Sequence, residues 1–290
     1  MAFPKNGVVE ALKIVPADYG LFSVAKPEDS SNEDRWIRGF AQEWATDLYA
    51  ATNWDATDTT SDTVASNATP TYYTEIDPFF VELEEVISTF SFLGLDRIER
   101  IKLQLEGVTQ KAVEQELWDG AIRKGETHPN LALSNSTATV LNSGTALNAA
   151  RALALLDYKI GEASPCGEQG VIHMTRDTAA LLSSSYMIFH KENHLQTVSG
   201  TPIVIGTGYS GTGPTGATGA TASDTNKWMY GTGAVKTYVG EIDVVNDNLS
   251  QAYDVDGNQN DMRLKAIRPA AVYFDTSIHI AVRVDLSAAI

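Results

Sequence analysis

The stretch DRIERIKLQLEGVTQKAVEQELWDG, residues 96–120, decides how the rest of the chain is interpreted. Its apolar residues recur at steps of three and four and form one stripe, which predicts an amphipathic helix. Asp96 and Gly120 stand where a helix N-cap and a helix stop are expected. At about 1.5 Å per residue the helix spans roughly 35 Å, enough to support a whole domain. The stripe consists of Ile98, Ile101, Leu105, Val108 and Ala112.

Two other segments alternate apolar and polar residues, which is the period of a β-strand with one buried face. FFVELEE, residues 79–85, precedes the helix and places Val81 and Leu83 on one face. TSIHIAVRVDL, residues 276–286, lies near the end of the chain. Such regular alternation favours an antiparallel sheet. The apolar face of the second segment consists of Ile278, Ile280, Val282, Val284 and Leu286.

Residues 141–235 follow a different pattern, in which helical and strand-like stretches succeed one another. GTALNAARALALLDYKIGEA and RDTAALLSSS have helical patterns, whereas GVIHMT and TPIVIGTG have the composition of short buried strands. This alternation predicts a compact α/β unit, and the glycine-rich residues 208–226 are expected to form an exposed loop. Because the unit is inserted into a domain of sheet and long helix, the predicted fold class is α+β.

The first 75 residues lack the composition of a compact core. Residues 1–33 are polar and interrupted by proline, which indicates an arm. Residues 39–95 contain ten acidic residues and no lysine or arginine, and their middle part, NWDATDTTSDTVASNATPT, has few aliphatic residues. The region is therefore predicted to form a long hairpin or excursion with a polar tip.

Aromatic side chains flank this polar tip on both sides. Exposed aromatic surface tends to mark interfaces, so we expect these rings to contact a neighbouring subunit. The alternative is that the rings fill the core of their own subunit. The candidate interface residues are Trp36, Phe40, Trp44, Trp54, Tyr72 and Tyr73.

Charge and cysteine content exclude several classes of protein. The chain has 21 Lys plus Arg against 37 Asp plus Glu, a net charge of −16, which disfavours binding to nucleic acid or to anionic membranes. The single cysteine, Cys166, rules out an internal disulfide framework. No apolar run has the length of a signal peptide or of a membrane span, so we expect a soluble protein made inside a cell.

Short motifs in the chain do not assemble into a catalytic constellation. Gly206–Gly211 match a dinucleotide fingerprint, but the sequence that follows cannot begin the required helix. His190 and His194 have metal-pair spacing without the rest of a metalloprotease motif, and Cys166 has no visible catalytic histidine. Asp254–Asp261 resemble half of a calcium loop and are better interpreted as a turn, with a weak cation site left open. We therefore predict a protein that is not an enzyme and has no catalytic residues, cofactor or metal.

The order of these segments resembles the major capsid proteins of tailed bacteriophages, with the greatest similarity to those of actinobacteriophages. Four stretches carry the resemblance, which covers nearly the whole chain. They are RWIRGFAQEWATDLYAATNWDATD (35–58), YYTEIDPFFVELEE (72–85), QLEGVTQKAVEQELWDG (104–120) and RPAAVYFDTSIHIAVRVDLS (268–287).

The resemblance implies the Hong Kong 97-like fold, also called the Johnson fold. By that resemblance residues 1–33 form the N-terminal arm and residues 34–75 the extended loop. Residues 76–140 and 236–290 form the peripheral domain, in which 96–120 is the spine helix. Residues 141–235 form the axial domain.

The function implied by the resemblance is assembly, through hexamers and pentamers, into the icosahedral head that encloses the double-stranded DNA of a phage. The expected location is the virion, assembled in the cytoplasm of the host bacterium. Expected partners are other copies of the chain, a portal and a separate scaffolding protein, since the chain starts at Met1 without a long helical prodomain; a decoration protein is a further partner that the family allows. Some relatives crosslink a lysine of the extended loop, and the absence of lysine from 39–95 predicts that this crosslink does not form. Two alternatives remain open: an encapsulin-like compartment, and a hydrolase with an unrecognised site.

Overall fold

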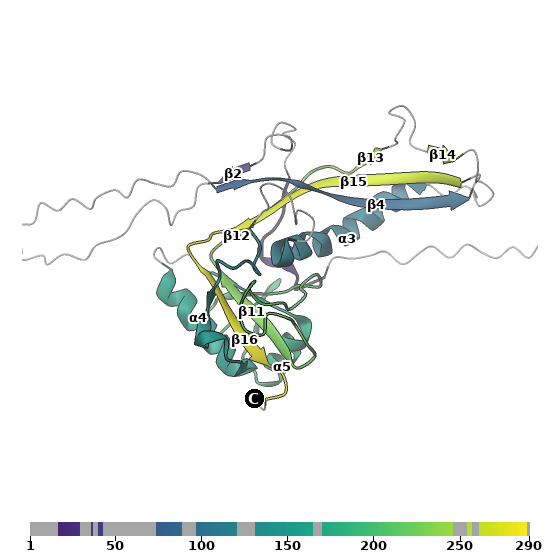
Figure 1. Cartoon of the computed structure of the whole chain (residues 1–290). Coiled ribbons are helices and arrows are strands. Elements are labelled where there is room, and N and C mark those ends of the chain that lie inside the picture. The colour runs from purple at the N-terminus through teal and green to yellow at the C-terminus, as the bar shows by residue number, and fades with distance from the viewer. Residues whose placement is uncertain are drawn as a thin grey trace, which may run out of the picture.

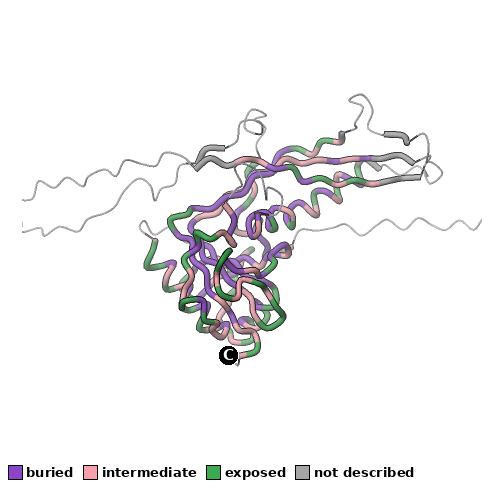
Figure 2. Tube along the Cα trace, in the orientation of Figure 1, coloured by how far each residue is buried: buried purple, intermediate pink, exposed green. Residues whose placement is uncertain are grey.

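The computed structural model describes residues 17–29, 36, 40–42, 74–88, 97–120, 131–164, 170–245, 254–256 and 261–288. They form two parts that meet at one joint (Figure 1). One part is a long sheet lined by helix α3 (Arg97–Asp119), and the other is a rounded unit that contains α4 (Ala149–Ala163) and α5 (Arg176–Ser184). Buried residues lie where the two parts meet and continue through the inside of the rounded unit (Figure 2).

The long sheet is organised around β15 (Asp261–Phe274). Strand β4 (Phe79–Ser88) pairs antiparallel with β15 along one edge, over ten residues of each strand. The other edge carries β12 (Val235–Val239), β13 (Asp243–Val245) and β14 (Asp254–Asp256) in turn. The predicted alternation of β4 is confirmed, because Phe79 and Val81 are buried while Glu82 is exposed.

Helix α3 confirms the prediction for 96–120 within one residue at each end. Ile101 and Leu105 of the predicted stripe are completely buried. The backbone N–H of Gly120 donates to the carbonyl of Glu116 at 2.8 Å, and its φ of +62° ends the helix as predicted. The last turns of α3 are buried on several sides and not along one stripe only. The side chain of Trp118, for example, is completely buried.

The rounded unit contains an eight-stranded mixed sheet. Its order is β5 (Thr139–Val140), β16 (His279–Asp285), β11 (Asn226–Thr232), β7 (Val171–Met174), β10 (Pro202–Ile205), β9 (His194–Gln196) and β8 (Phe189–Lys191). Strand β6 (Leu147–Asn148) also pairs with β16, next to a 3₁₀ turn at Leu141–Gly144. Helices α4 and α5 and strands β7 and β10 confirm the predicted α/β alternation.

Strand β16 lies in a different sheet from the one that its place in the sequence suggested. It pairs antiparallel with β11 inside the rounded unit, whereas the predicted division assigned 236–290 to the other domain. Alternation identifies a strand but does not identify its partner, so the sheet could not be chosen from the pattern. Ile280, Val282 and Val284 pack in one core cluster with the buried side chains of α4.

The chain passes between the rounded unit and the long sheet at two neighbouring connections. On one side of the joint β12 pairs with β15, and on the other side β11 pairs with β16. Residues 233–234 connect β11 to β12, and residues 275–278 connect β15 to β16. These two crossings lie side by side. The N–H of Asp275 donates to the carbonyl of Ala234 at 2.8 Å, and the N–H of Gly233 donates to the carbonyl of Ile278 at 3.1 Å.

The segment 17–29 packs on the body of its own subunit, which corrects the prediction that all of residues 1–33 form an arm. It forms a short helix α1 (Leu21–Val24) and a strand β1 (Glu28–Asp29) that pairs with β12. Leu21 is completely buried, and the carbonyl of Ala25 accepts a hydrogen bond from Thr237 at 2.8 Å. The isolated buried leucine gives no periodic signal, which is why the pattern did not reveal this contact.

Strands β2 (Phe40–Gln42) and β3 (Thr74–Ile76) pair antiparallel and form a separate two-stranded sheet. This pairing confirms the root of the predicted hairpin. Residues 43–73, the polar tip and most of its aromatic flanks, lie outside the described residues.

A completely buried carboxylate on α3 connects the N-terminal segment and the rounded unit to the helix. One oxygen of Glu114 accepts from the backbone N–H of Leu21 and from the side chain of Gln110, both at 2.9 Å. The other oxygen accepts from the N–H of Gly208 at 2.9 Å and the hydroxyl of Thr207 at 3.0 Å. All four hydrogen bonds are charge-assisted, which makes them stronger than bonds between neutral groups.

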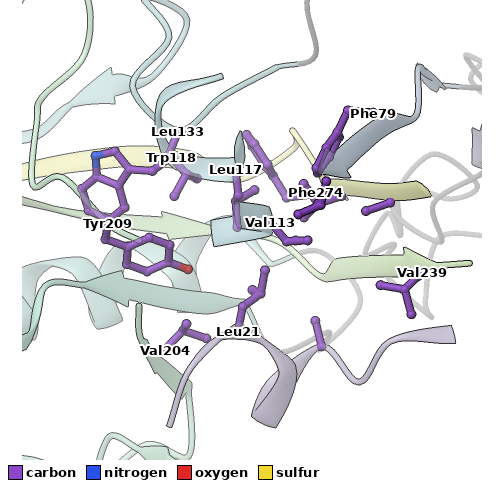
Figure 3. Packing of buried hydrophobic residues seen from close by; sticks show 14 of the residues in the cluster. Leu21, Phe79, Val113, Leu117, Trp118, Leu133, Val204, Tyr209, Val239 and Phe274 are labelled. Atoms are coloured by element: carbon purple, nitrogen blue, oxygen red, sulfur yellow. The ribbon is translucent and has the colours of Figure 1, made fainter. Parts of the chain in front are cut away.

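Apolar side chains surround this carboxylate in one core cluster. Leu21 from the N-terminal segment, Val113 and Leu117 from α3, and Val204 and Tyr209 from the rounded unit belong to it (Figure 3). The cluster therefore joins three segments that are far apart in the sequence.

We predict that Glu114→Ala strongly destabilises the subunit. The substitution leaves two buried backbone N–H groups without an acceptor, and each such loss costs about 1–3 kcal/mol, so the expected total is roughly 3 kcal/mol or more. Urea unfolding followed by circular dichroism measures this change. Gln115→Ala, at the next and exposed position of α3, is the control and should stay within about 0.5 kcal/mol of the wild type. Equal effects of the two substitutions would contradict the anchoring role of Glu114.

Candidate functional site

The structure places two of the six candidate interface residues at the root of the β2–β3 hairpin or beside it. Trp36 is half-buried and packs against a small cluster of Tyr238, Ala271 and Tyr273 on β12 and β15. Phe40 begins β2, where it pairs with Ile76. Trp36 thus covers its own sheet in part. The remaining four candidates, Trp44, Trp54, Tyr72 and Tyr73, lie outside the described residues.

The hairpin root lies next to the long sheet. Strand β3 leads into β4 through Asp77 and Pro78, and it also contacts β15. The proline cannot donate a hydrogen bond to a strand ladder, so it suits the point at which pairing changes from β2 to β15. The hairpin root is therefore attached to the long sheet, whose strands β4 and β15 also contact α3.

A buried polar cluster in the rounded unit is the arrangement most similar to a catalytic one, since it contains a histidine between two hydroxyl groups. His173 Nδ1 lies 2.9 Å from the hydroxyl of Tyr209, and Nε2 lies 3.0 Å from that of Thr232. The hydroxyl of Thr232 donates to the carbonyl of Gly233. Its oxygen therefore accepts from Nε2–H, and Nδ1 accepts from Tyr209.

Burial keeps this histidine neutral. Desolvation lowers the pKa of His173 from 6.5 to about 3, with a smaller contribution from the nearby His279. Burial also lowers the pKa of His279, whose Nε2 lies 3.0 Å from the carbonyl of Leu133. Both nitrogens of His173 are engaged with protein atoms and its side chain is completely buried. The cluster therefore has a structural role: its hydrogen bonds link β7, β11 and the loop that contains Tyr209.

The glycine motif at 206–211 serves packing. Residues 206–225 contain neither helix nor strand, and a Cβ added at Gly208 would lie 2.4 Å from the carbonyl oxygen of Lys111. Glycine therefore allows the loop backbone to touch α3 and to reach Glu114. This part of the loop is buried, which corrects the prediction that all of 208–226 is exposed. The helical pattern of 96–120 did not reveal the role of Glu114; the available signal was an acidic residue next to Val113 and Leu117 in a predicted helix.

The histidine pair and the described residues of the half calcium loop lie in ordinary strand pairs. His190 and His194 lie on the two strands of the β8–β9 hairpin rather than on a helix. Asp256 pairs with Asp261 where β14 and β15 form an antiparallel ladder, and the residues between them lie outside the described part of the chain. Cys166 lies outside the described residues, and among the residues that are described no three His, Cys, Asp or Glu side chains gather to hold a metal ion. None of the helices that the structure describes has the length and hydropathy needed to cross a membrane.

Apolar side chains are exposed on the rounded unit near two hollows. The larger hollow, of about 910 Å³, lies between α4 and the residues that join β9 to β10, and Tyr158 and Val198 line it with 62% and 80% of their surface exposed. The smaller, of about 390 Å³, lies between α5 and the β8–β9 hairpin. Exposed apolar surface of this kind suits contacts between proteins.

The neutral His173 predicts a specific loss of stability in acid. The unfolded chain takes up a proton at this residue below pH 6.5, and the folded chain does so only near pH 3. Stability therefore falls as the pH drops through this window, by up to about 1.4 kcal/mol per pH unit for one proton. Urea midpoints measured from pH 7 to pH 4 should fall more steeply for the wild type than for His173→Gln. Parallel curves would contradict this assignment.

Comparison with solved structures identifies the architecture. No family model and no curated protein matches the sequence. The capsid chain of an empty GTA particle superposes with a TM-score of 0.56 at 10% identity, covering 99% of this chain and 96% of that one. A chain of Gordonia phage Cozz gives 0.53 at 12% identity, with 99% and 92% covered. A chain of Mycobacterium phage Cain gives 0.52 at 12% identity, with 98% and 94% covered. The chain therefore has the α+β Hong Kong 97-like capsid fold that its sequence resembles.

Proposed function

We propose that this chain is the major capsid protein of a tailed bacteriophage and assembles through hexamers and pentamers into the icosahedral head. The observation that carries the proposal is the match of nearly the whole chain to the capsid chains of GTA particles, which are similar in length. A shared fold alone does not fix a function, but the match covers 99% of this chain and 96% of the GTA capsid chain.

The proposed division of labour follows the predicted domains. Residues 34–75 act as the extended loop and reach a neighbouring subunit from the β2–β3 root. Residues 76–140 and 236–290 form the peripheral domain, except that β5 and β16 belong to the sheet of the axial domain at 141–235. Residues 17–29 are docked on their own subunit, so they are not part of a projecting N-terminal arm. If the loop of each subunit grips the next subunit, the contacts are head-to-tail, and repeated head-to-tail contacts can close into rings.

The charge of the chain suits a container for DNA. A net charge of −16 leaves few cations to neutralise phosphates, so enclosed double-stranded DNA would not adhere tightly to the wall. The proposal therefore includes enclosure of DNA without sequence-specific binding. It gives the protein a structural role in the virion, after assembly in the cytoplasm of the host, with a scaffolding protein, a portal and a decoration protein as proposed partners.

Electron microscopy of the expressed protein or of purified particles tests this function. Closed icosahedral shells are expected, and particles from infected cells should contain nuclease-protected double-stranded DNA. Shells filled with an enzyme would favour the encapsulin-like alternative. A lone monomer with pH-dependent hydrolytic turnover, abolished by one substitution, would favour the hydrolase.

Deleting residues 50–70 should abolish shells and leave soluble monomers or capsomers. The deletion removes the tip that we propose to grip the neighbour, and it leaves the paired strands β2 and β3 in place. Negative-stain microscopy and size-exclusion chromatography measure the result, and an unchanged unfolding temperature shows that the body is intact. Normal shells from the deleted chain would refute the assigned role of the loop.

Boiling particles in detergent with a reductant should release one band near 31.3 kDa. Residues 39–95 contain no lysine, so the loop cannot supply the amine for the crosslink that some relatives form. The reductant removes any disulfide through Cys166. A covalent ladder under these conditions would contradict the prediction.

A further inference from the structure

The smaller hollow on the rounded unit has an apolar floor at the place where the described chain begins. Ala179 and Leu195 on its floor are buried, and Ile188 and Ile205 beside them are half-buried. Ala17, the first described residue, lines the same hollow. A hollow with a hydrocarbon floor is stabilised when apolar side chains displace water from it.

The described chain already runs along this hollow. The carbonyl of Tyr19 accepts a hydrogen bond from the N–H of Ile205 on β10 at 2.8 Å. The ring of Tyr19 meets that of His190 edge to face, with centroids 5.4 Å apart. The N-terminal segment is therefore attached to both β10 and the β8–β9 hairpin just after it enters the described structure.

The residues directly upstream of Ala17 are rich in aliphatic side chains, which can cover the apolar floor of the hollow. VVEALKIVP, residues 8–16, contains six aliphatic residues and only two charges. Glu10 is the only carboxylate in residues 1–16, and the exposed Arg176 lies on the rim.

We propose that residues 8–15 dock into this hollow on their own subunit. One peptide bond joins Pro16 to Ala17, so no connecting loop has to be closed. A tether this short gives an effective concentration on the order of millimolar or more, which makes docking within the subunit favourable even when the contact is weak. The docked segment covers the apolar floor before subunits meet one another.

Hydrogen exchange of the full-length subunit tests this placement without any need for particles, so its outcome is independent of the proposed function. Amides of residues 8–15 should exchange about tenfold or more slowly than those of an unstructured peptide, because docking has to open before exchange. Ala180→Glu adds a charged side chain at an exposed position of α5 that lines the hollow. This substitution should remove the protection.

Ala154→Glu is the matched control, because Ala154 is an exposed alanine on α4 that lines the other hollow. It should leave the protection unchanged. Unprotected residues 8–15 in the wild type, or protection that Ala180→Glu does not change, would overturn the proposal. Protection that disappears on dilution would also overturn it, and would assign the hollow to the segment of another copy or to a partner protein.

Discussion

The subunit depends on one buried carboxylate. Glu114 accepts hydrogen bonds from the N-terminal segment, from the glycine loop and from its own helix, so it fixes three parts of the chain at one point. A charge is costly to bury unless hydrogen bonds compensate it, and here four of them do. Gly20 and Gly208 permit this arrangement, because a Cβ at either position would collide with the groups of α3 around the carboxylate.

This anchor explains why the two halves of α3 are buried differently. The first half lies against the long sheet, so a single apolar stripe suffices, as Ile101 and Leu105 illustrate. The second half is enclosed by the glycine loop and by α1 as well. Trp118 donates there to the carbonyl of Thr212, and Asp119 accepts from the hydroxyl of the same threonine at 2.7 Å. Helix α3, which lines the long sheet, is thereby also part of the core that it shares with the rounded unit.

Helical periods and strand alternation predicted individual helices and strands, but they did not predict the contacts between segments that are far apart in the sequence. The period of 96–120 and the glycine that ends it specify α3, and alternation specifies β4 and β16. The partner of β16 depends on β11, some fifty residues earlier in the sequence, and no periodic signal encodes that choice. The docking of Leu21 and the role of Glu114 rest on single residues. Of the six candidate interface residues, Trp36 lies on its own sheet and Phe40 begins β2, and the expectation for the other four rests on composition alone.

The paired crossings at 233–234 and 275–278 determine how force passes through the subunit. Both are covalent backbone, and hydrogen bonds between them tie the two crossings together. A pull on the far end of the long sheet therefore reaches the rounded unit as tension along two peptide chains, and not only as shear on side-chain contacts. Stretching peptide bonds is far harder than sliding packed side chains, so the joint resists extension while the surrounding contacts can still adjust in bending.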